Sequence, residues 1–255
     1  MLCLTASIAL TGAAPASAQE DARVFISVNG GLQALTSNFS QDVVFADSTG
    51  LYRDVLSGAA AHERARLESL YRVKSAVLFD LSGGVHLARN VGFGIGVSRF
   101  GTNDAASVSA QVPHPLYFDR DRSISGRSLP LSRTETAIHL QARLMLPVHE
   151  SVTVTAFGGP TLFRVEQQLV RDVRFSHEYP YDTAMFVMAI QRPASGSAVA
   201  FNLGADVAYY FSPSVGIGWL VRYGRATVEL PSIDEGSLRI QAGGLHTAWG
   251  LRLRF

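Results

Sequence analysis

The sequence predicts an all-β fold, an eight-stranded antiparallel up-and-down transmembrane β-barrel with long extracellular hairpins. Apolar and polar residues alternate with a period of two in about eight segments, which is the spacing of strands and not of helices. The connections between these segments alternate between short and long, and the face opposite the apolar one carries glycines and ions of both signs. Together these three features are typical of a barrel that crosses a membrane.

The composition excludes several classes of function. The 22 basic and 21 acidic residues give a net charge of +1, so no overall field favours nucleic acid as a partner. Cys3 is the only cysteine and lies near the start, which excludes disulfides, thiolate catalysis and cysteine-based zinc sites from the mature chain. We therefore expect no nucleic-acid partner, no metal and no cofactor.

The first eighteen residues have the features of a secretory signal peptide. They carry no charge, run apolar from Leu2 to Leu10, and end in a small-x-small cleavage pattern over residues 16–18. We predict a signal peptide over residues 1–18 and a single barrel domain over residues 19–255. No later stretch approaches eighteen consecutive apolar residues, so we expect no transmembrane helix.

The strands follow one another along the chain. The first is predicted over residues 24–34, and the longest over residues 65–87, where unbroken alternation outweighs the helix propensity of residues 59–70. The other six are predicted over residues 91–98, 135–146, 152–162, 199–211, 215–224 and 243–255.

Short and long connections alternate between these strands. The tight turns are residues 88–90, 147–151 and 212–214, and the long connections are residues 37–64, 102–133, 164–197 and 225–238. Two unequal ends of this kind are typical of an up-and-down barrel in a membrane. Much of each long connection still alternates, so we expect these hairpins to project beyond the membrane as strands.

Alternation alone does not show which face points inward. A soluble lipocalin-like barrel would fill its interior with the Val/Leu/Ile/Phe face. The opposite face here carries glycine at positions 92, 94, 96, 216 and 218, and solvent-facing strand positions are usually not glycine, which packs nothing. Inside a narrow barrel the same glycines make room for long charged side chains. We therefore predict that the apolar face contacts lipid.

Nine ionisable residues are predicted to form a network along the enclosed axis. About eight strands leave an interior just wide enough for side chains to fill, and unpaired charges there would be costly. We interpret these ions as a buried salt-bridge plug between neighbouring strands, with a narrow or gated pore as the alternative. The set is Lys74, Asp80, Glu135, His139, Arg143, Asp206, Arg222, Arg252 and Arg254.

Aromatic residues are predicted at two other kinds of position. At the lipid interface, where amphipathic rings are favoured, we place Tyr209, Phe211, Trp219, Trp249 and Phe255, with a sandwich core as the alternative. The loops at residues 112–126 and 176–183 combine prolines, aromatics and charges, which either pack the hairpin tips together or form a surface for an extracellular ligand or protein. The candidate recognition residues are His114, Tyr117, Phe118, Arg120, Tyr179 and Tyr181.

The last five residues, "LRLRF" at 251–255, resemble the C-terminal signature of bacterial outer-membrane β-barrel proteins. With "VGFGIGVSRF" at 91–100 and "GGLHTAWGLRLRF" at 243–255, the chain is similar to the small OmpA-like and OmpW-like barrel families of the Gram-negative cell envelope. The resemblance implies an outer-membrane location, contact with outer-membrane lipid, and recognition of the strand ending at Phe255 by the barrel assembly machinery. These motifs identify no activity.

The histidines and serines do not form a recognisable catalytic or metal-binding set. No histidines are spaced as His-x-His or His-x-x-x-His, and no Gly-x-Ser-x-Gly nucleophile motif occurs. We therefore expect no enzyme and no catalytic residues, and predict a structural or surface-interaction protein with a plugged lumen. The alternatives are a narrow channel for small hydrophilic or amphipathic solutes and, with less support, an outer-membrane lipid hydrolase.

Overall fold

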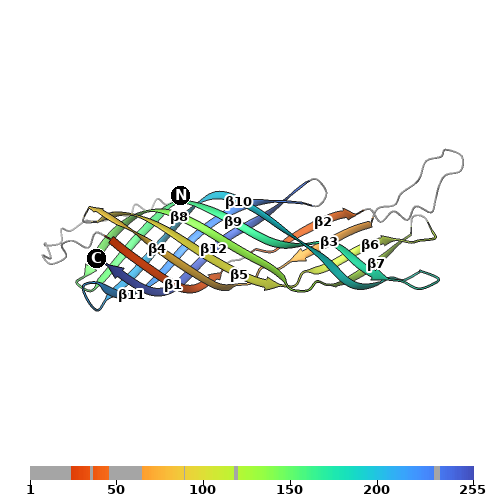
Figure 1. Ribbon diagram of the computed structural model, residues 1–255, viewed down its shortest axis with the longest axis horizontal. Helices are drawn as coiled ribbons and strands as arrows, with labels where there is room; N and C mark the ends of the chain where they lie inside the picture. Colours follow the sequence, from red (N-terminus) through yellow and green to blue (C-terminus); the bar gives the residue numbers. More distant parts are fainter. Residues whose placement is uncertain (1–23, 35–36, 46–64, 89, 118–119, 233–235) are drawn as a thin grey trace, which may run out of the picture.

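Two antiparallel β-sheets, one of them a closed barrel, make up the structure (Figure 1). The computed structural model describes residues 24–34, 37–45, 65–88, 90–117, 120–232 and 236–255. The strands are β1 (Val24–Ala34), β2 (Phe39–Phe45), β3 (Ala65–Tyr71), β4 (Ala76–Ala88), β5 (Val91–Asp104), β6 (Ser107–Pro113), β7 (Asp121–Arg127), β8 (Leu131–His149), β9 (Val152–Ser176), β10 (Met185–Tyr210), β11 (Val215–Pro231) and β12 (Ser237–Arg254). Within these ranges there is no helix of the length and hydropathy that a membrane span requires. The predicted signal peptide lies outside the described residues.

Eight strands close the barrel, as the sequence predicted. Around it the order is β1-β12-β11-β10-β9-β8-β5-β4, so consecutive barrel strands in the chain are neighbours in space. The pairs are antiparallel, and the circle closes where β1 pairs with β12. The predicted tight turns join β4 to β5, β8 to β9 and β10 to β11, at the end of the molecule that holds the C-terminus (Figure 1).

The strands are inclined to the barrel axis (Figure 1). Following paired residues once around the barrel from Leu146 leads back to the same strand at Thr136, ten residues away (146 minus 136). Closing a barrel with such a stagger goes with a strand tilt of roughly 35–45°. At this tilt a stretch of about 9–11 residues is long enough to cross the apolar part of a bilayer.

The second sheet continues four of the barrel strands. In the chain, β2 follows β1, β3 precedes β4, β6 follows β5, and β7 precedes β8. The sheet order β2-β3-β6-β7 therefore repeats the barrel order β1-β4-β5-β8. This sheet lies beyond the barrel, beside the projecting part of the hairpin β9–β10 (Figure 1). The long connections thus project as strands, as predicted.

The single strand predicted over residues 65–87 is wrong, because the chain changes sheets within it. Its first part is β3 in the second sheet and its second part is β4 in the barrel. Odd-numbered residues such as Leu67 are buried in β3, whereas even-numbered residues such as Asp80 are buried in β4. The four residues 72–75 between the strands change the buried face, so the odd-numbered face of β3 points inward and not toward lipid.

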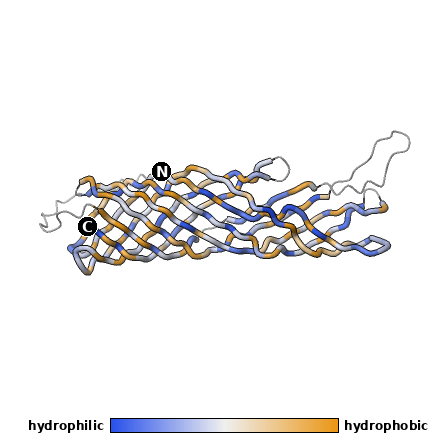
Figure 2. The backbone as a smooth tube through the Cα atoms, viewed as in Figure 1, coloured by the Kyte–Doolittle hydropathy of each residue, from blue (hydrophilic) through white to orange (hydrophobic). Residues whose placement is uncertain are grey.

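An apolar core joins the second sheet to the projecting hairpins. Leu67 and Ile124 from the sheet belong to one cluster with Val165, Leu169 and Leu230 from the hairpins, and none of these five is more than 3% exposed. Figure 2 shows hydrophilic and hydrophobic residues interleaved along strands of both the barrel and the second sheet. The two regions therefore share the alternating pattern, and they differ in the character of the enclosed face, which is polar in the barrel and apolar beyond it.

Candidate functional site

The barrel directs its apolar face outward and its polar face inward, as predicted. On β11 and β12, Trp219 is 41% exposed and Leu251 50%, whereas Arg222 is 1% and Arg252 2% exposed. Outward valine, leucine, isoleucine and phenylalanine residues continue this exposed apolar surface around the barrel. An exposed apolar surface this extensive is the lipid-facing band of a membrane barrel.

A continuous chain of charged and polar side chains crosses the lumen. The Arg252 guanidinium pairs with Asp206 through two nitrogens and donates to Asn29 Oδ1 at 2.6 Å. The Asn29 amide donates to Asp80 Oδ1 at 2.9 Å, and Arg222 Nη1 lies 2.6 Å from Asp80 Oδ2. All five residues are at most 4% exposed. The two ion pairs skip over intervening strands, so the expectation that ionic partners lie on neighbouring strands was wrong for them, whereas Asn29 bonds to residues of its neighbours β12 and β4.

Asn29 was missed by the sequence prediction, which considered only ionisable residues. It lies on β1 with its side chain inward, between Arg252 and Asp80, and connects the two ion pairs. The signal that could have found it is its place on the polar face of the first strand.

Glycine makes room for these ions, as the sequence suggested. A Cβ atom at Gly218 would lie 2.7 Å from Nε of Arg252, and a Cβ at Gly94 would lie 3.4 Å from Cδ of Arg143. Both distances are tight, so larger side chains at these positions would displace the guanidinium groups.

The predicted ionic set is partly corrected by the structure. Lys74 is not in the lumen, because it belongs to the segment where the chain changes sheets; its side chain is 74% exposed and pairs with Asp104 at 2.8 Å. Arg254 lies at the lumen mouth, over the ring of Tyr210 at 3.9 Å. Arg143 is buried over the ring of Phe25 at 4.1 Å, a cation–π contact in place of an ion pair.

A second buried layer lies between the charge chain and the apolar core. Glu135 accepts from Arg133 Nε at 2.7 Å, from the Gly243 N–H at 2.8 Å, and from Gln33 Nε2 at 3.2 Å. His246 Nε2 lies 2.9 Å from Gln33 Oε1. This layer closes the lumen a second time with hydrogen-bonded side chains.

His139 is enclosed in the lumen without access from outside. Its ring nitrogens lie 2.9 Å from Ser98 Oγ and 2.9 Å from Thr161 Oγ1, and His139 is 0% exposed. Among the described residues no three His, Cys, Asp or Glu side chains are grouped so that they could hold a metal ion. The arrangement is that of a hydrogen-bonded structural histidine.

The predicted interface aromatics are all exposed, at different levels of the barrel. Tyr209, Phe211 and Phe255 are 52–63% exposed at strand ends near the tight turns. Trp219 and Trp249 are paired across β11 and β12, with ring centroids 5.7 Å apart, midway along the outward apolar stretch. The first three residues thus lie at strand ends, and a position of any of the five rings at the lipid interface stays a prediction.

The tips of the hairpins β6–β7 and β9–β10 pack on each other. Arg120 Nη2 lies 3.1 Å from Asp182 Oδ1, and Arg122 Nη1 donates to the carbonyl of Tyr181 at 3.2 Å. The His114 side chain is buried and its Nε2 lies 3.8 Å from the same Asp182 oxygen. These contacts favour the interpretation that loop charges and aromatics hold the tips together.

Several rings nevertheless remain exposed at these tips. Tyr117 is 54% exposed and packs on His114, and Tyr179 is 81% exposed and packs on Tyr181. Phe118 lies outside the described residues. Recognition of an extracellular ligand by this set stays a prediction.

A buried tyrosine connects the second sheet to the long hairpin. Tyr71 Oη donates to Gln41 Oε1 at 2.9 Å and accepts from the Val170 N–H at 2.7 Å. Val170 lies beside a register irregularity in the pairing of β9 with β10. Burial raises the pKa of Tyr71 to about 12. The sequence did not predict this contact, because a single barrel strand over residues 65–87 would place Tyr71 on the apolar, lipid-facing side.

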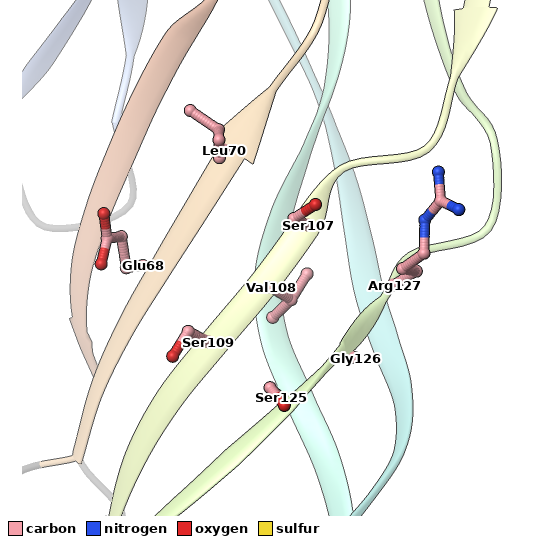
Figure 3. Close-up of a pocket in the computed structure, with 8 residues that line it drawn as sticks. All are labelled: Glu68, Leu70, Ser107, Val108, Ser109, Ser125, Gly126 and Arg127. Carbon is pink, nitrogen blue, oxygen red and sulfur yellow. The ribbon is translucent and has the colours of Figure 1, made fainter.

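The outer face of the second sheet carries a shallow groove of about 440 Å³. Figure 3 shows three serines, Ser107, Ser109 and Ser125, between Glu68 and Arg127. The lining thus offers hydroxyl groups and one charge of each sign to a polar partner. The complete lining is Glu68, Leu70, Ser107, Val108, Ser109, Ser125, Gly126 and Arg127.

Comparison with known proteins finds similarity among solved structures. No protein-family model matches the chain, and no curated protein matches it by sequence. The outer membrane protein OprG of Pseudomonas aeruginosa is 12% identical, with a TM-score of 0.45, over 91% of this chain and 96% of OprG. The outer membrane protease OmpT of Escherichia coli is 9% identical, with a TM-score of 0.45, over 93% of this chain and 100% of OmpT.

A third similar structure is that of Ail, the attachment invasion locus protein of Yersinia pestis. Ail is 12% identical, with a TM-score of 0.35, over 91% of this chain and 99% of Ail. That structure contains Ail in complex with the heparin analogue sucrose octasulfate. All three neighbours are outer-membrane proteins of bacteria.

Proposed function

We propose that this chain is an outer-membrane protein whose barrel is a closed anchor and whose projecting sheet and hairpins contact an extracellular partner. The observation that carries the proposal is a network of bonded side chains that spans the lumen. It runs from Asp206 through Arg252, Asn29 and Asp80 to Arg222. Its members are linked to one another and almost fully buried, which supports a lumen filled by side chains.

The region beyond the barrel supports the same function. The lumen side chains are followed by the layer around Glu135 and then by the apolar core, so polar solutes meet a second barrier. The Ser98–His139 pair is enclosed in the lumen, which argues against a hydrolase that uses it. A rigid β-sheet that holds grooves and aromatic tips away from the membrane suits recognition at the cell surface.

The strand ending at Phe255 supports assembly in the outer membrane. The Phe255 N–H donates to the Val24 carbonyl at 2.9 Å, and the Val24 N–H donates back at 3.1 Å. Phe255 thus extends the pairing of β1 with β12 that closes the barrel, and we propose that the barrel assembly machinery recognises this strand. We include outer-membrane lipid and this machinery as partners in the proposal.

Single-channel recording in planar lipid bilayers tests the closed lumen. The purified, folded protein is expected to give no discrete conductance steps, with insertion checked by the shift in gel mobility between unboiled and boiled samples. Discrete steps that disappear in Arg222→Ala or Asp206→Ala would overturn the proposal and support the narrow channel instead.

A further inference from the structure

The outward apolar surface ends sharply across four neighbouring strands. Val97, Ile138, Leu162 and Val199 are paired side by side on β5, β8, β9 and β10. All four are 42–71% exposed. This row is the last apolar one on the outer face before the second sheet begins.

The next outward row is polar and carries two arginines. Arg99 is paired with Thr136, Thr136 with Arg164, and Arg164 with Ser197. Adjacent strands are about 4.8 Å apart, so the two arginine backbones are roughly 10 Å apart with the threonine between them. Two guanidinium groups and two hydroxyl groups are thus gathered where one anion could contact several of them.

The level of this row matches that of lipid headgroups. A strand tilt of roughly 40° inclines the row, so Arg99 and Arg164 differ in height by about 6 Å. The polar headgroup layer on each side of a bilayer is roughly 5–7 Å thick. Both arginines therefore fit within one headgroup layer when the apolar row below them contacts hydrocarbon.

The two arginines are available for a ligand. Arg99 is exposed and forms no hydrogen bond or ion pair with other described residues. Arg164 pairs with Glu166 at 3.3 Å, but the side chains are 66% and 60% exposed, and such surface pairs contribute little. Two other cations beyond the apolar surface lie closer to a side-chain partner, Arg225 at 3.1 Å from Gln241 and Lys74 at 2.8 Å from Asp104.

We infer that Arg99 and Arg164, with Thr136 between them, bind the phosphate group of an outer-leaflet lipid. The inference rests on the proposed membrane position of the barrel. The phosphate would accept from both guanidinium groups and from the threonine hydroxyl, while the lipid chains lie along the row of Val97 and Leu162. Such a contact fixes the depth of the barrel and gives it a preference for lipids with phosphate at the headgroup.

Native mass spectrometry of the full-length protein in detergent micelles tests the site. The probes are phosphatidic acid and diacylglycerol with identical chains, which differ only in the phosphate, and inorganic phosphate alone. The folded wild type is expected to retain phosphatidic acid and not diacylglycerol. Arg99→Gln with Arg164→Gln is expected to weaken retention roughly thirtyfold, the effect of two cations near an anionic surface.

Two further variants sharpen the measurement. Arg171→Gln with Arg192→Gln removes the same charge from exposed positions on the projecting hairpin and is expected to retain the lipid as wild type does. Glu166→Gln removes the acidic neighbour of Arg164 and is expected to strengthen retention.

The outcomes separate this site from the proposed function. Equal loss in both double variants, or equal retention of diacylglycerol and phosphatidic acid, would overturn the site. Binding of inorganic phosphate with the same dependence on Arg99 and Arg164 would assign the row to free phosphate and overturn the lipid assignment. Gel mobility shows whether each variant is folded, and bilayer conductance tests the closed lumen independently.

Discussion

The barrel and the region beyond it enclose side chains of opposite character, polar within the barrel and apolar beyond it. Even-numbered residues of β11 are buried along its whole length, Arg222 within the barrel and Val228 beyond it, whereas the odd-numbered Trp219 and Glu229 are exposed. The strand continues without a break between the two regions. The same side of the strand stays buried throughout, and the residue types on the two sides exchange, from an apolar exterior around a polar lumen to a polar exterior around an apolar core.

This difference shows that alternation indicates two faces and not which one is enclosed. Where lipid covers the outside, apolar residues there need no partner and polar residues gather in the lumen. Where water covers the outside, the apolar residues of β9–β12 and of the second sheet must be buried against each other.

The largest expected effect comes from breaking the lumen ion pair. Arg222→Met leaves Asp80 buried without its cation and should lower the free energy of unfolding by about 3–5 kcal/mol. Adding Asp80→Asn should recover part of this loss, because the uncompensated charge is gone. Urea unfolding, followed by fluorescence of the two outward tryptophans Trp219 and Trp249, measures both. An unchanged free energy of unfolding in Arg222→Met would show that the lumen is not a closed, dry plug.

The comparison of outer faces is tested by placing one charge in each region of β8. Leu140→Arg puts a cation in the lipid-facing band and should cost about 2–4 kcal/mol in bilayer vesicles. Ser132→Arg puts it on the water-facing part and should change stability by no more than about 0.5 kcal/mol. Equal costs for the two variants would contradict the assignment of lipid to one region and water to the other.

A smaller loss of stability is expected when the contact between the second sheet and the hairpin β9–β10 is removed. Tyr71→Phe leaves the buried Val170 N–H and the Gln41 side chain without this partner, and should cost about 1–3 kcal/mol. Amide hydrogen exchange should show the loss in the projecting region, with barrel amides unchanged. Faster exchange throughout the barrel would contradict a local role.

The same tyrosine predicts a dependence on alkaline pH. The folded pKa of about 12 is above the ordinary value of 10, so the folded state keeps a proton that the unfolded state loses. The stability that depends on neutral Tyr71 is complete below pH 10 and falls as the pH rises to about 12. In Tyr71→Phe this fall should be absent from pH titrations of hydrogen exchange.

The smallest effect is expected at the exposed pair Lys74–Asp104. Burial alone would raise the pKa of Asp104, but hydrogen bonds from Lys74 and Thr102 lower it overall. Lys74→Gln should therefore change the free energy of unfolding by at most about 1 kcal/mol. Any difference from wild type should disappear as the pH falls through the lowered pKa of Asp104. A loss similar to that of Arg222→Met would return Lys74 to the lumen set.

Several features of the site could be predicted from the sequence alone. Period two placed Asp80, Arg222 and Arg252 on the enclosed face, and glycines at positions such as 218 marked where guanidinium groups needed space. The partners could not be assigned in this way, because Asp80 and Arg222 come from strands that are not neighbours. Closure brings them across the lumen, and closure is a property of all eight strands.

The sequence by itself determined eight alternating barrel strands with short and long connections and an apolar exterior, since the period, the turn lengths and the glycines are local features. Tertiary structure alone decided that β3 leaves the barrel, that its face reverses, and that Tyr71 contacts β9. The physical reason is that a strand has two faces at every position, and only its packing against other strands, lipid or water decides which face is buried.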